Sequence, residues 1–318
     1  MKNDEDSKRG GVLKFVLIAA AIICSVFLLF AIAEASNTSE DATNSQAVHQ
    51  YEQANDNSGQ HDSLDSSQVN QARLRQFIRS NQNKPVDTTQ LDQQINSILS
   101  QNSDVTFGVS IIDLNTGAVH DYGYAGAMTA ASVTKVLTAV YYLHQVELGN
   151  RSLSTVMANG YTAQQNIESM IVLSDNDAWH VMNENLGYPQ LQDYAHSIGL
   201  PSYAYAYNVI SSHDTAKLFG DLYQRKLINE SNTQLLLTYM EEANYRQFII
   251  PAVPEYDTVY HKVGFYSLSV NDAAIITNSN QAIVLSIYTE STHTPDQNRI
   301  ARLMQEITTP TLQTFSLN

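Results

Sequence analysis

The stretch of sequence that decides the fold covers residues 132–148 and reads SVTKVLTAVYYLHQVEL. Its apolar residues recur at helical spacing and Gly149 follows it, so it predicts a helix. Ser132 and Lys135 stand one turn apart at the start of this helix, on the same face. Lys135 is the one lysine of the sequence with a serine three residues before it. A serine whose proton a neighbouring amine can accept is a nucleophile for acyl transfer, and the free N–H groups of a helix start would lie beside its oxygen.

A second segment, Ser174-Asp175-Asn176, follows in the order that this chemistry needs. We expect Ser174 to pass a proton to the leaving nitrogen. We expect the Asn176 amide to hold Lys135 and a substrate carbonyl. Helix caps and turns use the same residue types, so Asp175 is predicted to be structural.

A third segment, His261-Lys262-Val263-Gly264, precedes a run of residues typical of a strand. Lys262 would bind a substrate carboxylate. As a second cation it would also lower the pKa of Lys135, and a lysine serves as a base only if some fraction of it is neutral. Together the three segments predict a serine nucleophile with a proton relay.

In this order the segments resemble the penicillin-recognising serine acyl-enzymes, that is, the class A β-lactamases and the related D,D-peptidase penicillin-binding proteins. The resemblance covers about residues 89–318 and includes Arg246 to Pro251, Asn271 to Ile276 and Asp296 to Ile307. It implies an α/β (α+β) fold in which an antiparallel sheet is flanked by helices and joined by an all-helical lobe. The histidines of the sequence show no metal-ligand spacing, and we expect no metal and no cofactor.

The resemblance also assigns roles to residues of the third segment. It implies that the backbone N–H groups of Ser132 and Phe265, next to Gly264, form an oxyanion hole. The substrate would be a β-lactam or a D-alanyl peptidoglycan stem peptide, and the sequence does not distinguish the two.

The sequence departs from the family in two places. Val263 replaces the usual hydroxyl residue, which removes one hydrogen bond to a substrate carboxylate at a cost of about 1–3 kcal/mol. Class A β-lactamases also carry a glutamate that activates the deacylating water, with an asparagine four residues later. The stretch 199–212 has no acidic residue. If Asn208 matches that asparagine, Ala204 occupies the glutamate position, and deacylation is expected to be slow.

The neighbouring residues have structural interpretations. His213 and Asp214 could supply the missing base, but a helix-start pair is the favoured interpretation. Tyr203, Tyr205 and Tyr207 alternate and could line a cleft, although we expect them to cover the core. Trp179 and His180 are predicted to be packing residues.

The rest of residues 89–318 predicts a sheet made from both ends of the chain. A helix is expected near Leu91–Leu99, and a hairpin of Val105–Asp113 with Ala118–Tyr122 follows. Residues 162–242 are predicted to be mostly helical. Strands at 259–265, 272–277 and 283–289 and a last helix at 296–307 complete the domain.

The N-terminal region predicts membrane attachment. Residues 15–33 carry no charge, and four basic residues precede them, so they predict a transmembrane signal-anchor helix with residues 1–14 in the cytoplasm. Ala33-Glu34-Ala35 resembles a cleavage site, so a cleaved signal peptide is the alternative. Residues 36–88 are rich in Asn, Gln, Ser and Asp and predict a disordered polar linker. The domain at 89–318 would then lie outside the cytoplasm, at the cell membrane.

Composition excludes some functions. Residues 89–318 hold 21 acidic and 9 basic residues, which argues against nucleic acid as a partner because phosphate binding needs the opposite sign. Cys24, the single cysteine, lies within the predicted membrane helix, so the exported part is expected to have no disulfide and no thiolate metal site. The main hypothesis is therefore a membrane-tethered serine hydrolase. The alternative is a catalytically weak wall-binding or sensor module with the same fold.

Overall fold

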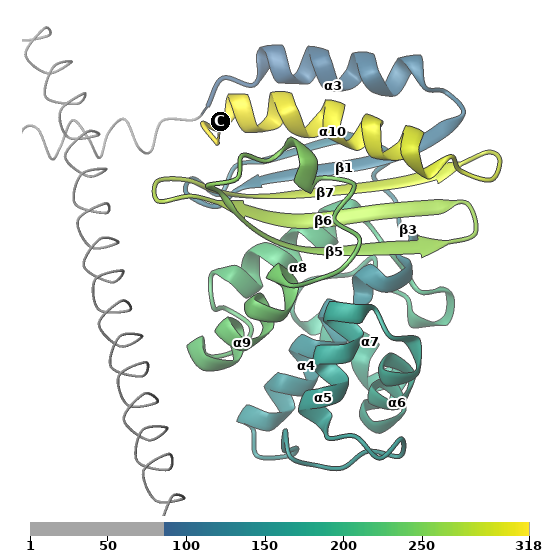
Figure 1. Ribbon diagram of the computed structural model, residues 1–318, viewed down its shortest axis with the longest axis vertical. Coiled ribbons are helices and arrows are strands. Elements are labelled where there is room, and N and C mark those ends of the chain that lie inside the picture. The colour runs from purple at the N-terminus through teal and green to yellow at the C-terminus, as the bar shows by residue number, and fades with distance from the viewer. Residues whose placement is uncertain (1–85, 318) are drawn as a thin grey trace, which may run out of the picture. The chain divides into compact units, whose positions relative to one another are not determined.

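The computed structural model describes residues 86–317, which are built around a five-stranded antiparallel sheet of order β2-β1-β7-β6-β5 (Figure 1). The strands are β1 (Val105–Asp113), β2 (Val119–Gly123), β5 (Thr258–Tyr266), β6 (Ser269–Thr277) and β7 (Ala282–Ser291). Because β1 pairs with both β2 and β7, the two ends of this region share one sheet, as the sequence predicts. A short ribbon of β3 (Met128–Thr129) and β4 (Val209–Ile210) lies apart from it.

Helices cover both faces of the sheet. The first and last helices, α3 (Thr89–Gln101) and α10 (Gln297–Thr314), lie side by side over one face (Figure 1). On the other side lie α8 (Ser212–Tyr223), α9 (Glu230–Glu241) and a helical lobe. All nine residues of β6 are buried, as expected of an inner strand covered on both faces.

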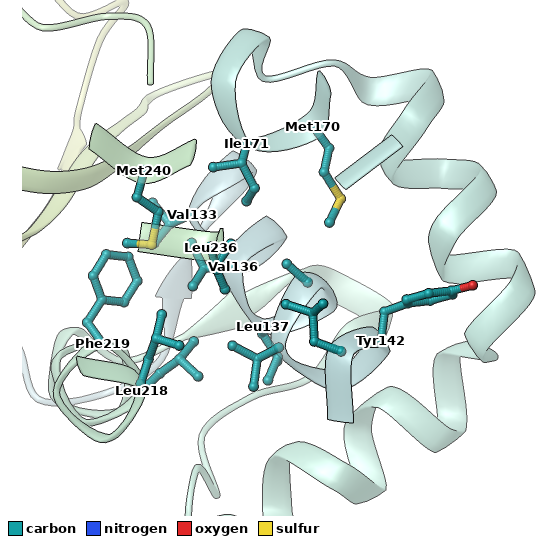
Figure 2. Close-up of a cluster of buried hydrophobic side chains, with 14 of the residues drawn as sticks. Val133, Val136, Leu137, Tyr142, Met170, Ile171, Leu218, Phe219, Leu236 and Met240 are labelled. Atoms are coloured by element: carbon teal, nitrogen blue, oxygen red, sulfur yellow. The ribbon is translucent and has the colours of Figure 1, made fainter. Parts of the chain in front are cut away.

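The helical lobe is built around α4 (Lys135–Glu147). Its other elements are α5 (Ala163–Glu168), the π-helix η2 (Ser169–Leu173), α6 (Asn176–Leu186) and α7 (Tyr188–Ser197). Figure 2 shows Val136 and Leu137 of α4 among side chains from η2 and α9, including Ile171 and Leu236. This apolar packing holds the start of α4 against η2 and α9.

The ends of these helices follow from local sequence. Thr162 and Gln165 form a reciprocal capping box at the start of α5. Asp175 accepts hydrogen bonds from the backbone N–H groups of Asp177 and Ala178 and so begins α6. Asp175 is thus structural, as predicted. Gly187, with a φ of 87°, separates α6 from α7.

The predicted strands and helices are present, but some boundaries differ: the strand predicted at 272–277 begins at Ser269, and the helix predicted from Ser132 begins as an α-helix at Lys135. The strand predicted at 105–113 has the same limits in the structure. The last helix does not stop at Ile307 but continues to Thr314 through Pro310. Proline lacks the N–H of an interior turn and argues for a helix end, yet burial of Thr311 and Leu312 maintains the helix here.

The predictions for residues 1–14, 15–33 and 36–85 lie outside the described residues. Within 86–317, no helix has both the length and the apolar character needed to cross a membrane.

Candidate active site

Ser132 lies in a strained segment. It belongs to the short 3-10 helix η1 (Ala131–Thr134), which runs directly into α4. Ala131 has a φ of 50°, a left-handed conformation that disfavours a non-glycine residue by about 1–3 kcal/mol. Such strain persists only where the surroundings hold the backbone in place. The α-helix α4 begins at Lys135, about one turn after Ser132.

Two asparagines hold this segment. The Asn208 amide donates to the Ala131 carbonyl at 2.9 Å and accepts from Thr134 Oγ1 at 2.7 Å. On β6, the Asn271 amide donates to the carbonyl of Thr129 at 2.8 Å. The loop residue and the sheet residue together restrain the backbone on which Ser132 depends.

The edge strand β5 approaches this backbone closely. A Cβ atom on Gly264 would lie 2.4 Å from the Ala130 carbonyl oxygen and 3.0 Å from the Ser132 backbone nitrogen. Glycine is therefore the residue that allows this approach. Phe265 follows Gly264 and lines the same cleft as Ser132. The structure thus brings together the residues that the sequence assigns to the oxyanion hole.

Lys135 is fully buried and bonded to the second segment. Its Nζ donates to the Ser174 carbonyl at 2.6 Å and to Asn176 Oδ1 at 2.8 Å, and lies 3.4 Å from Ser174 Oγ. The Trp179 ring centroid is 5.4 Å away. Burial lowers the pKa of Lys135 to about 8, against a smaller opposing effect of Asp175. The hydrogen bonds of residues 86–317 include none to Ser132 Oγ, so Lys135 contacts Ser174 rather than Ser132.

Ser174 occupies a second strained position. It ends the π-helix η2 with a φ of 60°, in the left-handed region. This turn directs its hydroxyl toward Lys262, whose Nζ donates to Ser174 Oγ at 2.9 Å and to the Val263 carbonyl at 3.2 Å. The Ser174 hydroxyl is therefore within reach of two lysines.

Lys262 is also buried. Burial, together with repulsion from Lys135, lowers the pKa of Lys262 to about 7, while the charge of Asp272 raises it. The sequence predicts that this second cation lowers the pKa of Lys135. In the structure burial alone lowers the pKa of Lys135, and the repulsion between the two lysines lowers the pKa of Lys262 instead.

Replacing Lys262 with methionine is expected to raise the free energy of unfolding by about 2 kcal/mol at pH 6. The protonated amine is disfavoured in the fold because its pKa falls from 10.5 to about 7. The unfolded chain binds this proton more tightly, so the penalty is full below about pH 7 and fades as the pH rises toward 10.5. Urea unfolding at pH 6 and pH 10 measures this difference. A Lys262→Met variant that is less stable than the unmodified protein at pH 6 would show that the hydrogen bonds of Lys262 outweigh its burial.

Ser132, Asn176 and Phe265 border a cleft of about 720 Å³. It is rich in aromatic side chains, and no acidic residue of the described chain lines it. The lining residues are Thr129, Ala131, Ser132, Asn176, Trp179, His180, Asn183, Tyr188, Tyr205, Ala206, Tyr207, Asn208, Phe265 and Tyr266.

The cleft includes aromatic residues that the sequence interpretation assigns elsewhere. Tyr205 and Tyr207 are exposed and line the cleft, so the prediction that they cover the core is wrong; Tyr203 alone is buried. Trp179 and His180 also line the cleft rather than serving only as packing residues. The alternating tyrosines at 203–207 were the one sequence signal for a cleft. Which of them are buried depends on how this loop packs near α7, and the sequence does not show that.

The loop between α7 and α8 holds Ala204 and Asn208. Ala204 and Val209 exchange two backbone hydrogen bonds of 3.0 and 3.2 Å, and Val209 also pairs with Thr129 of β3. Asp214, a candidate replacement base, is buried and accepts from the Ser202 backbone N–H at 2.8 Å and its hydroxyl at 2.6 Å. Asp214 is thus engaged in holding the loop.

Two other candidate residues lie away from this chemistry. His213 pairs with Asp121 at 2.9 Å near the surface, which fits its structural interpretation. Arg246 is exposed and donates to the Glu241 carbonyl at 2.7 Å. Within residues 86–317, no group of three or more His, Cys, Asp or Glu side chains is placed to hold a metal ion.

Comparison with known proteins fits this geometry. The model of the β-lactamase enzyme family matches residues 90–315. No curated protein matches the chain. The structure of PBP-A has a TM-score of 0.68 and 23% identity, covering 73% of this chain and 98% of PBP-A. A PBP-A mutant solved as an acyl-enzyme with penicillin G gives a TM-score of 0.68 and 22% identity, covering 73% of this chain and 99% of the mutant.

An ancestral class A β-lactamase is also similar, with a TM-score of 0.65 and 19% identity over 71% of this chain and all of that chain (100%). At these identities the solved structures establish the fold alone. They share the class A β-lactamase-like arrangement of an antiparallel sheet and helices. The family model covers most of the chain and all three motif segments. The chain therefore belongs to the β-lactamase enzyme family.

Proposed function

We propose that this protein is an extracytoplasmic serine hydrolase that forms an acyl-enzyme on Ser132 with a β-lactam or a D-alanyl peptidoglycan peptide. One observation carries the proposal. The Ser174 hydroxyl lies between two buried lysines, 2.9 Å from Lys262 Nζ and 3.4 Å from Lys135 Nζ. Burial brings the pKa values of these lysines close to neutral pH, where a base and an acid are both available.

Lys135 is suited to accept the Ser132 proton. A neutral amine has two N–H donors and one lone pair. The two short bonds from Lys135 to the Ser174 carbonyl and Asn176 Oδ1 use both donors. The lone pair then remains to accept a proton as Ser132 Oγ attacks the substrate carbonyl.

Ser174 would complete the proton transfer. When the tetrahedral intermediate collapses, the carbonyl–nitrogen bond breaks and the Ser174 hydroxyl gives its proton to the leaving nitrogen. A lysine ammonium returns a proton to Ser174. The backbone N–H groups of Ser132 and Phe265 would stabilise the oxyanion.

The acyl-enzyme is expected to be cleared slowly. Hydrolysis of the ester needs a positioned water and a base, and the described residues that line the cleft include no carboxylate. The similar PBP-A mutant was solved as an acyl-enzyme with penicillin G, which supports a β-lactam as the acylating reagent here.

Labelling with a fluorescent penicillin tests the proposal. Ser132→Ala is expected to abolish the labelled band, since no other serine of the sequence has a lysine three residues after it. Ser100→Ala, an exposed serine on α3, is the matched control and should label normally. Undiminished labelling of Ser132→Ala would place the nucleophile elsewhere.

A second candidate function is recognition without turnover. Val263, in place of a hydroxyl residue, and Ala204, in place of the glutamate, both favour a wall-binding or sensor module. In such a protein a penicillin would bind without forming a covalent adduct. Recovery of unmodified protein after denaturation would therefore distinguish it from the acyl-enzyme.

We also propose, from the sequence, that residues 15–33 anchor the protein in the membrane with the hydrolase domain outside. Protease added to intact cells is then expected to release a soluble fragment by cutting between about residues 40 and 87. If protease releases no fragment until the cells are lysed, the proposed orientation, with the hydrolase domain outside, is wrong.

A further inference from the structure

A second pair of ionisable residues lies behind the Lys262 strand. His261 and Asp272 are both fully buried, and His261 Nδ1 is 3.1 Å from Asp272 Oδ1. Val263 pairs with Asp272 across the β5–β6 ladder, so His261 lies diagonally opposite Asp272. Side chains alternate along a strand, so this pair faces away from the side to which Lys262 points.

The hydrogen bonds determine how many protons the pair carries. His261 Nε2 is 3.2 Å from the Ala243 carbonyl oxygen, which can only accept. Nε2 must therefore carry a hydrogen. The contact between Nδ1 and Asp272 Oδ1 needs another hydrogen, which lies on Nδ1 of an imidazolium or on Oδ1 of a protonated carboxyl group. The second oxygen, Asp272 Oδ2, accepts from the Ile249 backbone N–H at 3.2 Å. In either form every hydrogen-bonding atom of the pair has a partner and the pair has no net charge.

This charge state matters to Lys262. The charged groups that act on Lys262 are Lys135 from α4, which lowers its pKa, and Asp272 from β6, which raises it. The charged group that hydrogen-bonds to His261 is Asp272 of β6. The segment after α9 bonds to this pair through two backbone groups, the Ala243 carbonyl next to His261 and the Ile249 N–H next to Asp272. An imidazolium at His261 would offset the field of Asp272 at Lys262.

The pair also restrains residues 243–249. The rings of Tyr245 and Phe248 pack against Phe265 of the cleft, with centroids 5.2 and 5.4 Å apart. Tyr245 has a φ of 67°, a strained conformation that needs support. Hydrogen bonds from the two ends of this segment to His261 and Asp272 supply that support.

We propose that His261 is a positioning residue, held as an imidazolium by Asp272, which neutralises the Asp272 charge so that Lys262 can exchange a proton with Ser174. The proposal rests on the proposed function for its consequence in acylation. The charge state of the pair and its effect on the Lys262 proton can be measured without any substrate.

The direct test is NMR titration of Lys262 in protein labelled with ¹³C at the lysine ε carbon. His261→Gln leaves Asp272 uncompensated and is expected to raise the titration midpoint of Lys262 by about half a unit or more. Asp272→Asn removes the carboxylate that holds the imidazolium, so the buried His261 becomes neutral and the Lys262 midpoint is expected to stay close to that of the unmodified protein. The double variant His261→Gln/Asp272→Asn has a neutral pair again and should titrate close to the unmodified protein.

A purely structural role predicts a different pattern. Loss of packing would lower the melting temperature of both single variants without raising the Lys262 midpoint in His261→Gln alone. A Lys262 midpoint that stays fixed in His261→Gln, or that rises equally in Asp272→Asn, would overturn the proposal. Should a single variant fail to fold, ¹⁵N-histidine spectra of the unmodified protein decide the charge state. Two protonated ring nitrogens on a buried histidine at pH 8 are expected, and a buried neutral imidazole would refute the proposal.

The pH profile of acylation by a fluorescent penicillin then tests the link to catalysis. Its acidic limb should follow the Lys262 midpoints, moving to higher pH in His261→Gln and staying close to that of the unmodified protein in Asp272→Asn. If the unmodified protein is not acylated, the proposed function is wrong. The NMR titration of Lys262 still tests the charge of the His261–Asp272 pair, because it needs no substrate. If acylation occurs and its profile ignores the shifted midpoints, the link from His261 to Ser132 is wrong.

Discussion

Replacing Lys135 with methionine is expected to slow acylation of Ser132 by about 10³-fold or more while the protein remains folded. Lys135 is the base to which the proposed mechanism gives the Ser132 proton, and Lys262 is bonded to Ser174 Oγ and the Val263 carbonyl instead. Stopped-flow measurement of penicillin acylation gives the rate.

The stability of Lys135→Met separates catalysis from folding. Removing the amine leaves the Ser174 carbonyl and the Asn176 amide without a donor, but it also removes a buried charge whose pKa burial lowers to about 8. These effects oppose each other, so the free energy of unfolding should change by no more than about 1 kcal/mol. Lys226→Met, at an exposed lysine 3.1 Å from Asp221, is the control and should acylate normally. A Lys135→Met protein that unfolds would indicate a structural lysine, and one that acylates at the normal rate would remove Lys135 from the mechanism.

The acyl-enzyme is expected to persist, with a burst of one equivalent of a chromogenic cephalosporin followed by slow turnover. Introducing a carboxylate by Ala204→Glu should speed release of the acyl group by about 10²-fold or more, the range typical of general-base assistance. Ala204 pairs with Val209, which pairs in turn with Thr129 close to the nucleophile segment. A glutamate at this position would therefore start from a backbone that is hydrogen-bonded toward Ser132.

The neighbouring alanine provides the matched control for Ala204→Glu. Ala206 lies in the 3-10 turn η3 (Tyr205–Tyr207) at the border of the cleft, so Ala206→Glu adds the same charge two residues away. Faster release in Ala204→Glu alone supports the proposed alignment of the loop, whereas faster release in Ala206→Glu alone would shift it. Rapid steady-state hydrolysis by the unmodified protein, without a burst, would show that another residue already supplies the base.

The elements that local patterns encode were predictable from sequence. Alternation and β-branched residues mark β1 over 105–113, and the structure has the same limits. The Ser132 and Lys135 spacing likewise placed both residues at the start of one helical segment. The end of α10 was predicted too early, at Ile307. The helix continues through Pro310 because burial of the residues after it outweighs one missing hydrogen bond.

The features that sequence did not predict depend on contacts between distant segments. Tyr205 and Tyr207 border the cleft because of how the loop after α7 packs, and alternation alone does not say which face is buried. Trp179 lies near Lys135 through the packing of α6 against α4. The hydrogen bonds of His261 depend on the β5–β6 register, which brings Asp272 next to it, and on the carbonyl of Ala243, 18 residues earlier in the chain. The sequence showed the histidine without showing its partners.

The central claim is that Ser132 becomes covalently acylated, and intact-protein mass spectrometry with a penicillin tests it most directly. The account predicts a single adduct of the penicillin mass on the denatured protein, located by peptide mapping at Ser132 and absent from Ser132→Ala. Unmodified protein after long incubation, or an adduct at any other residue, would contradict it.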